Sequence, residues 1–368
     1  MIIVYLFYLT PLLIIGLIVY FIIRALRGRI KKGVKEKDWY LQLFLSKEDT
    51  VSQFFFLFSV FFLGVTLLAF NKDLGDPLSW RTILLFTSIF GVVIAYYFKV
   101  IYTLAASLIG LAAWWGIQAA EWAQEKDIKS TALLTGLLFI ATLFYLLGRA
   151  HEKEIKFKRV SIVYSILGLI PITGVLFFLS TKSGLRTLEK ITEGTSFFSS
   201  WEITLSLFVF LIFIVGILIY TLSKNLVFKP EAVAIGFLVV LFCIIALLPE
   251  QTMFLQQEDY YGVYGRTELS GTGILWTIFF NILIFLELVG IIFLGYLKQE
   301  DWLINLGVFF IFIFIFVKYF DWFFTFLNKS IFFIGAGILL FAVGWLMEKG
   351  RRYLLSTIER ERASKINN

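Results

Sequence analysis

A single carboxylic acid stands within a long apolar run in the last third of the sequence. Glu287 lies in NILIFLELVG and is the only acidic residue of 273–296. An ionised group in an apolar environment is costly unless it is paired. An acidic residue at this position is therefore a candidate ligand-binding residue. The structural alternative is a protonated Glu287 hydrogen-bonded between helices, and both remain open. Asn281 lies six residues earlier, roughly 240° away around a helix, on a different face.

A second group of residues that could bind a ligand lies on one face of a predicted helix. Trp114, Gln118, Glu121 and Trp122 follow the spacing i, i+4, i+7 and i+8. Indole rings beside a carboxylate could form a ligand-binding pocket for a cation or a sugar. The alternative, and the commoner role of such a stripe, is anchoring at the membrane interface.

The residue types that hold most cofactors are scarce. Cys243 and His151 are the single cysteine and the single histidine, so a disulfide, an iron–sulfur cluster or a multi-histidine metal centre within this chain is excluded. There is no Walker loop, HExxH or cysteine pair. We therefore expect no cofactor and no metal. His151 lies in the basic segment GRAHEKEIKFKR, where we expect it to be solvated.

Composition indicates the environment that must position these residues. The chain has 368 residues, of which 60% are hydrophobic and 16% charged, whereas soluble domains are roughly 45–50% apolar and about 25% charged. A soluble fold of this length could not bury that much apolar surface. Lipid offers no partner for backbone polar groups, so the spans must be helices. We predict an all-α, polytopic transmembrane helical bundle that forms a single domain over 1–368, with the lipid bilayer as its partner.

Eleven segments have the length and composition of membrane spans. The least certain boundary is at Lys99, where a single long re-entrant hairpin is the alternative to two spans. The predicted spans are 2–23, 53–70, 82–98, 100–119, 131–148, 160–180, 202–223, 231–249, 273–296, 302–320 and 330–347.

Basic residues indicate the orientation. They concentrate in 24–52 and 348–368, which predicts cytoplasmic positions for both segments, with the N-terminus outside and the C-terminus inside. The first is a basic cytoplasmic loop that ends in an interfacial helix, and the second is a basic cytoplasmic tail. The net charge of +7 fits anionic lipid headgroups at these loops and does not require nucleic acid.

The pattern Lys-x-x-Asp-Trp occurs three times, each at a predicted membrane boundary. Tryptophan prefers the headgroup level, lysine can bury its stem while its ammonium reaches water, and aspartate can cap the helix that follows. A pairing of Lys318 with Asp321, pinning the last hairpin, is a further interpretation. The residues of this structural motif are Asp38, Trp39, Asp301, Trp302, Lys318, Tyr319, Asp321 and Trp322.

Small residues predict close helix packing. Ala112, Gly116 and Ala120 stand four apart, which favours a central position for 100–119 in the bundle. The glycine-rich span 330–347 is a second candidate. Such faces could also mediate a homo- or hetero-oligomer. Pro171 should kink 160–180, and the carbonyl that it frees could be met by a neighbouring helix or by a hydroxyl such as that of Thr173.

The segment KYFDWFFTFLNKSIFFIGAGILLFAVGWLMEKGRR, 318–352, resembles the C-terminal signature of a bacterial polytopic membrane-protein family. This is the domain-of-unknown-function group numbered twenty-one fifty-seven. The signature has an aromatic–aspartate motif, here Tyr319 and Asp321, followed by a Phe/Gly-rich helix and a basic end. AAWWGIQAAEW and FYLLGRAHE are similar to its earlier helices. The family has no assigned reaction, so the resemblance implies a multi-pass protein of the bacterial cytoplasmic (inner) membrane.

Two classes of function fit these observations. The first is a non-enzymatic ligand-binding, transporter-like or envelope-scaffold protein. The alternative is a membrane enzyme acting on a lipid-linked substrate at the outer face, for which paired carboxylates are needed. An enzyme predicts outer carboxylates that converge in a cleft, a carrier predicts a midplane site reached by Glu287, and a scaffold predicts neither. The candidate outer carboxylates are Glu121, Asp127, Glu258 and Asp259.

Overall fold

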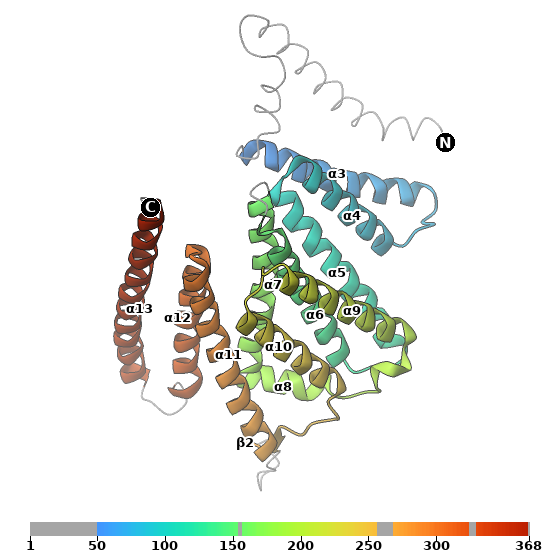
Figure 1. Cartoon of the computed structure of the whole chain (residues 1–368). Coiled ribbons are helices and arrows are strands. Elements are labelled where there is room, and N and C mark those ends of the chain that lie inside the picture. The colour runs from blue at the N-terminus through green and yellow to red at the C-terminus, as the bar shows by residue number, and fades with distance from the viewer. Residues whose placement is uncertain (1–49, 154–156, 256–267, 324–328, 367–368) are drawn as a thin grey trace, which may run out of the picture. The chain divides into compact units, whose positions relative to one another are not determined.

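The computed structural model describes residues 50–153, 157–255, 268–323 and 329–366 (Figure 1). The chain divides into two compact units. Unit 1 contains the described parts of 1–126, 139–168 and 200–227, and unit 2 contains those of 127–138, 169–199 and 228–368. Two helices contribute residues to both units, α6 (Thr131–His151) and α7 (Lys158–Leu179).

Ten described helices are long and apolar enough to cross a membrane. They coincide with ten of the eleven predicted spans, and the predicted span 2–23 lies outside the described residues. The chain is therefore an all-α, multi-pass integral membrane protein, as predicted. Besides α6 and α7, the spans lie in α3 (Thr50–Asp73), α4 (Trp80–Phe98), α5 (Ile101–Glu125), α9 (Trp201–Ser223), α10 (Lys229–Leu247), α11 (Gly271–Lys298), α12 (Asp301–Phe323) and α13 (Lys329–Ile366).

The boundary at Lys99 separates two helices that are each long enough to cross a membrane, which favours two spans over the re-entrant alternative. Lys99 ends α4 in the left-handed conformation, with φ 59° and ψ 38°. Val100 offers no side-chain cap to α5. Instead, the side-chain oxygen of Gln53 in α3 accepts hydrogen bonds from the backbone N–H of Ile101 (3.1 Å) and Tyr102 (3.4 Å). A polar residue of one helix thus satisfies the free N-terminus of another.

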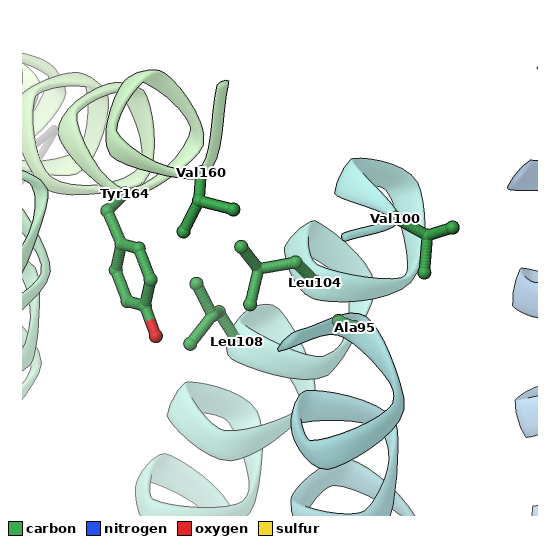
Figure 2. Close-up of a cluster of buried hydrophobic side chains, with 6 residues drawn as sticks. All are labelled: Ala95, Val100, Leu104, Leu108, Val160 and Tyr164. Carbon is green, nitrogen blue, oxygen red and sulfur yellow. The ribbon is translucent and has the colours of Figure 1, made fainter. Parts of the chain in front are cut away.

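Unit 1 is held together by small residues and an apolar cluster. In the α4–α5 hairpin, Gly91 faces Ser107 and Gly110 faces Ser88, in spaces where a Cβ atom would collide with the opposing hydroxyl. At the end of this hairpin, apolar side chains from α4, α5 and α7 meet (Figure 2). The cluster consists of Ala95, Val100, Leu104, Leu108, Val160 and Tyr164.

Among the described spans α6 is the most buried, and α5, for which we expected a central position, is buried less. Of the apolar segment of α6, 67% is buried, against 33% for α5 and 6% for α13. The reason is that α6 packs closely along its length. In unit 1, a Cβ atom on Gly148 would lie 2.9 Å from the Ser161 carbonyl oxygen of α7. In unit 2, the Thr135 hydroxyl donates to the Phe242 carbonyl of α10 at 3.0 Å.

In unit 2, α11, α12 and α13 lie side by side in antiparallel order (Figure 1). Gly295 of α11 faces Ile304 of α12, and Gly307 of α12 faces Ile292 of α11. These two close approaches fix the register of the hairpin. The segment 348–366, predicted as a basic tail, continues α13 as a helix.

Shorter elements cover the predicted outer ends of the unit 2 helices. Helix α8 (Lys182–Ile191) is amphipathic, and its N-cap Thr181 accepts from the Gly184 N–H at 3.1 Å. It buries Gly184, Leu185 and Leu188 and contacts α11. Strands β1 (Phe254–Leu255) and β2 (Glu268–Leu269) pair antiparallel, and the 3-10 turn η2 (Phe197–Ser199) precedes α9.

Candidate ligand site around Glu287

Glu287 makes one hydrogen bond between helices and leaves one oxygen unused. The Thr173 hydroxyl of α7 donates to its Oε1 at 2.8 Å. Its Oε2 is buried and has no hydrogen-bond partner within the described part of the chain. A carboxyl group can accept several hydrogen bonds, and a buried acceptor without a donor costs about 1–3 kcal/mol. The sequence prediction of a bond between helices is confirmed, but the bond satisfies only half of the group.

Thr173 plays a different part from the one expected. We named its hydroxyl as one possible partner of the carbonyl freed by Pro171, the other being a neighbouring helix. In the structure α7 continues as one helix through Pro171, and Thr173, which is buried, donates to Glu287.

A second polar group of atoms lies at the end of α7, and we call it the peripheral layer. It consists of the Ser180 carbonyl, Asn281 of α11 and Lys318 of α12. Ser180 directly follows α7, so its carbonyl has no helical N–H partner. It accepts from the ammonium of Lys318 and, at 3.3 Å, from the side-chain amide of Asn281. Two side chains from different helices thus converge on one backbone oxygen.

The two motif lysines that lie in the described residues, Lys298 and Lys318, are buried, contrary to expectation. We predicted that their ammonium groups would reach water. Lys318 is only 5% exposed and lies against the Phe314 ring, 5.8 Å from its centre. The side chain of Lys298 is 6% exposed, and its Nζ lies 3.8 Å from a carboxylate oxygen of Glu231. Each ammonium group interacts with an oxygen atom of the protein, and this interaction compensates for the cost of burying the charge.

The remaining motif residues lie at helix ends. Asp301 is the first residue of α12, where its charge suits the positive end of the helix dipole. The Trp302 indole N–H donates to Glu300 at 2.9 Å. Tyr319 packs against Gly335 of α13, where a Cβ atom would lie 2.5 Å from its hydroxyl oxygen. The last turn of α12 contains Asp321 and Trp322, and Asp38 and Trp39 lie outside the described residues.

The two polar layers lie at different depths of unit 2. Helices α7 and α11 are antiparallel, so Asn281 pairs with Ser180 near one end, and Glu287 pairs with Thr173 farther in. Six residues of helix separate Asn281 from Glu287, or about 9 Å at 1.5 Å per residue. We call Thr173 and Glu287 the deep layer. The sequence placed Asn281 and Glu287 on different faces, and the structure shows that both nevertheless reach α7.

The predicted aromatic stripe of unit 1 has a cationic partner that sequence reasoning missed. Arg81 of α4 forms an ion pair with Glu121, and the Gln118 amide donates to the same carboxylate at 3.1 Å. Trp114 and Trp122 are half-buried residues of the same helix, α5. The structure thus brings Gln118 and Glu121 together, but the carboxylate is already engaged by a cation of this chain. Arg81 and Glu121 are 40 positions apart, and no spacing rule connects them.

The single histidine is not solvated, and that expectation is wrong. His151 is half-buried at the end of α6, and its ring stacks on Tyr164 of α7 with centres 5.7 Å apart. Its Nδ1 lies 2.7 Å from the Leu147 carbonyl, and its Nε2 lies 3.1 Å from the Tyr96 hydroxyl. Because a carbonyl can only accept, Nδ1 carries the hydrogen. His151 therefore joins α4, α6 and α7 inside unit 1, although its sequence neighbours are basic.

No family model matches this chain, and neither curated proteins nor solved structures show a significant match. The resemblance of 318–352 to the family of unknown function stays a prediction. Across the described ranges, no three acidic, cysteine or histidine side chains group as metal ligands. The fold and the site together define a class of protein. It is a multi-pass helical membrane protein with a carboxyl group inside one of its two units, and only one oxygen of that group is hydrogen-bonded within the described residues.

Proposed function

We propose that this protein is a non-enzymatic, transporter-like component of the bacterial inner membrane that binds a small hydrogen-bond-donating ligand at Glu287. One observation carries the proposal: Glu287 Oε2 is buried and has no hydrogen-bond partner within the described residues. A ligand that supplies a donor to this oxygen removes a cost of about 1–3 kcal/mol. The free energy of ligand binding is correspondingly more favourable.

The apolar surroundings of Glu287 favour binding of a specific solute over contact of the carboxyl group with bulk water. Extending the α11–α12 register from Gly307 and Ile292 places Phe312 of α12 level with Glu287. The neighbouring α12 residues are phenylalanine and isoleucine, from Phe309 to Ile315. In such apolar surroundings water is excluded, so a polar interaction is stronger and more selective than at a surface.

The other two classes of function receive less support. A scaffold needs no unsatisfied carboxyl group among its spans. An enzyme at the outer face needs free paired carboxylates, whereas Glu121 is already bound by Arg81 and Gln118. Glu258 and Asp259 lie outside the described residues.

The proposal is tested by thermal unfolding of the purified full-length protein in detergent against a panel of small solutes. The panel contains ammonium, alkali-metal salts, primary amines, amino acids and sugars, each at several concentrations. We compare the wild type with Glu287→Gln and with Glu193→Gln, which alters an exposed residue of unit 2. At least one solute class should raise the unfolding temperature of the wild type and of Glu193→Gln but not of Glu287→Gln. Equal shifts in all three proteins, or no shift in the wild type, would overturn the proposal.

A further inference from the structure

Two phenylalanine rings lie between the two polar layers of unit 2. Phe177 is on α7, four residues after Thr173 and three before Ser180. It packs edge-to-face against Phe314 of α12, with ring centres 6.2 Å apart and an angle of 69° between the rings. At 1.5 Å per residue, Phe177 stands about 6 Å from the level of Thr173 and about 4.5 Å from that of Ser180.

Phe314 is tied to the peripheral layer as well. The Lys318 ammonium lies 5.8 Å from the centre of its ring. Lys318 also donates to the Ser180 carbonyl, so the ring, the ammonium and the end of α7 form one connected group. A cation over an aromatic face contributes roughly 0.5–2 kcal/mol, depending on its solvation. The position of the Phe314 ring is therefore coupled to the polar contacts at the end of α7.

From this arrangement we propose that Phe177 and Phe314 form an aromatic gate that separates the peripheral layer from Glu287. The gate controls entry to the deep layer from the end of α7, which the predicted topology places at the outer face. The inference rests on the proposed function, because it concerns access to the same carboxyl group. It adds the side of entry and the residues that limit it.

The physical reasoning concerns size and hydration. A polar solute that leaves the peripheral layer loses its hydrogen bonds with Ser180, Asn281 and Lys318. The next donor and acceptor, Thr173 and Glu287, lie about 9 to 10 Å deeper. Between the two layers it meets two packed rings that offer it no hydrogen bond. Removing one ring creates space where water and solutes can enter. Accessibility of Glu287 from the outer side should therefore rise when either ring is shortened to a methyl group.

The test uses two carbodiimides on cells and on inverted vesicles that contain the full-length protein. A carboxylic acid adds across the N=C=N group: its oxygen bonds to the central carbon and its proton moves to a nitrogen. The resulting O-acylisourea rearranges to a stable N-acylurea, which mass spectrometry locates on the peptide containing Glu287. Dicyclohexylcarbodiimide enters from the lipid. A water-soluble, charged carbodiimide reaches Glu287 only through an aqueous path.

The variants are Phe314→Ala, Phe177→Ala and the matched control Phe316→Ala. Phe316 is on the same helix and loses the same atoms, but its ring packs against Phe320, with centres 4.7 Å apart. In cells, the water-soluble reagent should label Glu287 at least tenfold faster in either gate variant than in the wild type or the control. Two gate variants are used so that a failure of one to fold does not decide the result.

Each outcome decides between the two proposals. Labelling by dicyclohexylcarbodiimide in every variant, with water-soluble labelling unchanged by both gate substitutions, overturns the gate and leaves the site at Glu287. Faster water-soluble labelling only in inverted vesicles overturns entry from the outer side. Absence of dicyclohexylcarbodiimide labelling at Glu287 in all proteins contradicts an accessible carboxyl group, and with it the proposed function.

Discussion

The hydrogen bond between Thr173 and Glu287 can be tested by a double-mutant cycle. Thr173→Val keeps the branched shape of the side chain but removes the hydroxyl that donates to Oε1 at 2.8 Å. Because Oε2 already lacks a partner in the described part of the chain, the substitution leaves a second buried acceptor without a donor. An unsatisfied buried acceptor costs about 1–3 kcal/mol, and we expect the free energy of unfolding to fall by that amount.

The second arm of the cycle is Glu287→Leu. It removes both acceptors and leaves only the Thr173 hydroxyl, which can turn to a carbonyl of its own helix. In the double variant, both polar partners are replaced by apolar groups of similar shape, which is often nearly neutral or stabilising. The two substitutions should therefore couple, and the double variant should be more stable than Thr173→Val alone by about 1–3 kcal/mol.

The assay is reversible unfolding of the purified protein in mixed micelles, followed by circular dichroism. Thr187→Val is the control, because Thr187 is an exposed residue of α8 whose hydroxyl bonds to the Ser183 carbonyl of its own helix at 3.0 Å. It should change the stability by less than about 0.5 kcal/mol. Additive effects of Thr173→Val and Glu287→Leu, or a Thr173→Val protein as stable as its control, would refute the reasoning.

Two further predictions concern packing and charge. Lys298→Met removes the ammonium 3.8 Å from the buried Glu231 carboxylate and should lower the free energy of unfolding by about 3–5 kcal/mol. Adding Glu231→Gln to the Lys298→Met protein should restore part of the lost free energy of unfolding, as measured by denaturation. If the double variant is no more stable than Lys298→Met alone, the ion pair is contradicted. Gly168→Ala places a Cβ atom 2.5 Å from the Tyr145 backbone nitrogen and should destabilise by about 1–3 kcal/mol. Gly174→Ala on the same helix meets open space and should be neutral or stabilising by up to about 1 kcal/mol, so equal melting of the two alanine variants would contradict this packing.

The spans were predictable because each one depends only on its own residues. A helix in lipid satisfies its backbone internally, so a run of about 20 apolar residues is sufficient evidence for it. Even the difficult boundary at Lys99 follows local chemistry, since one residue in the left-handed conformation ends α4. The cap on α5 was not predictable, because its acceptor, Gln53, comes from a different helix.

The lysine contacts show where local reasoning fails. At a membrane boundary, a lysine side chain usually extends to water. Lys318 instead contacts the Ser180 carbonyl, 138 positions away in the sequence, and Lys298 contacts Glu231, 67 positions away. The residues next to either lysine in the sequence do not predict these contacts. His151 likewise has basic neighbours in the sequence and aromatic neighbours in space.

By itself, the sequence determined the apolar environment, the helical spans and the presence of one carboxyl group among them, since hydrophobicity and backbone hydrogen bonding are properties of short segments. Only the tertiary structure decided that Thr173 satisfies one oxygen of Glu287 and that a buried Lys318 meets the end of α7. The same is true of the two rings that stand between these contacts. Such partners lie on helices far apart in the chain, so their meeting depends on how α7 packs against α11 and α12.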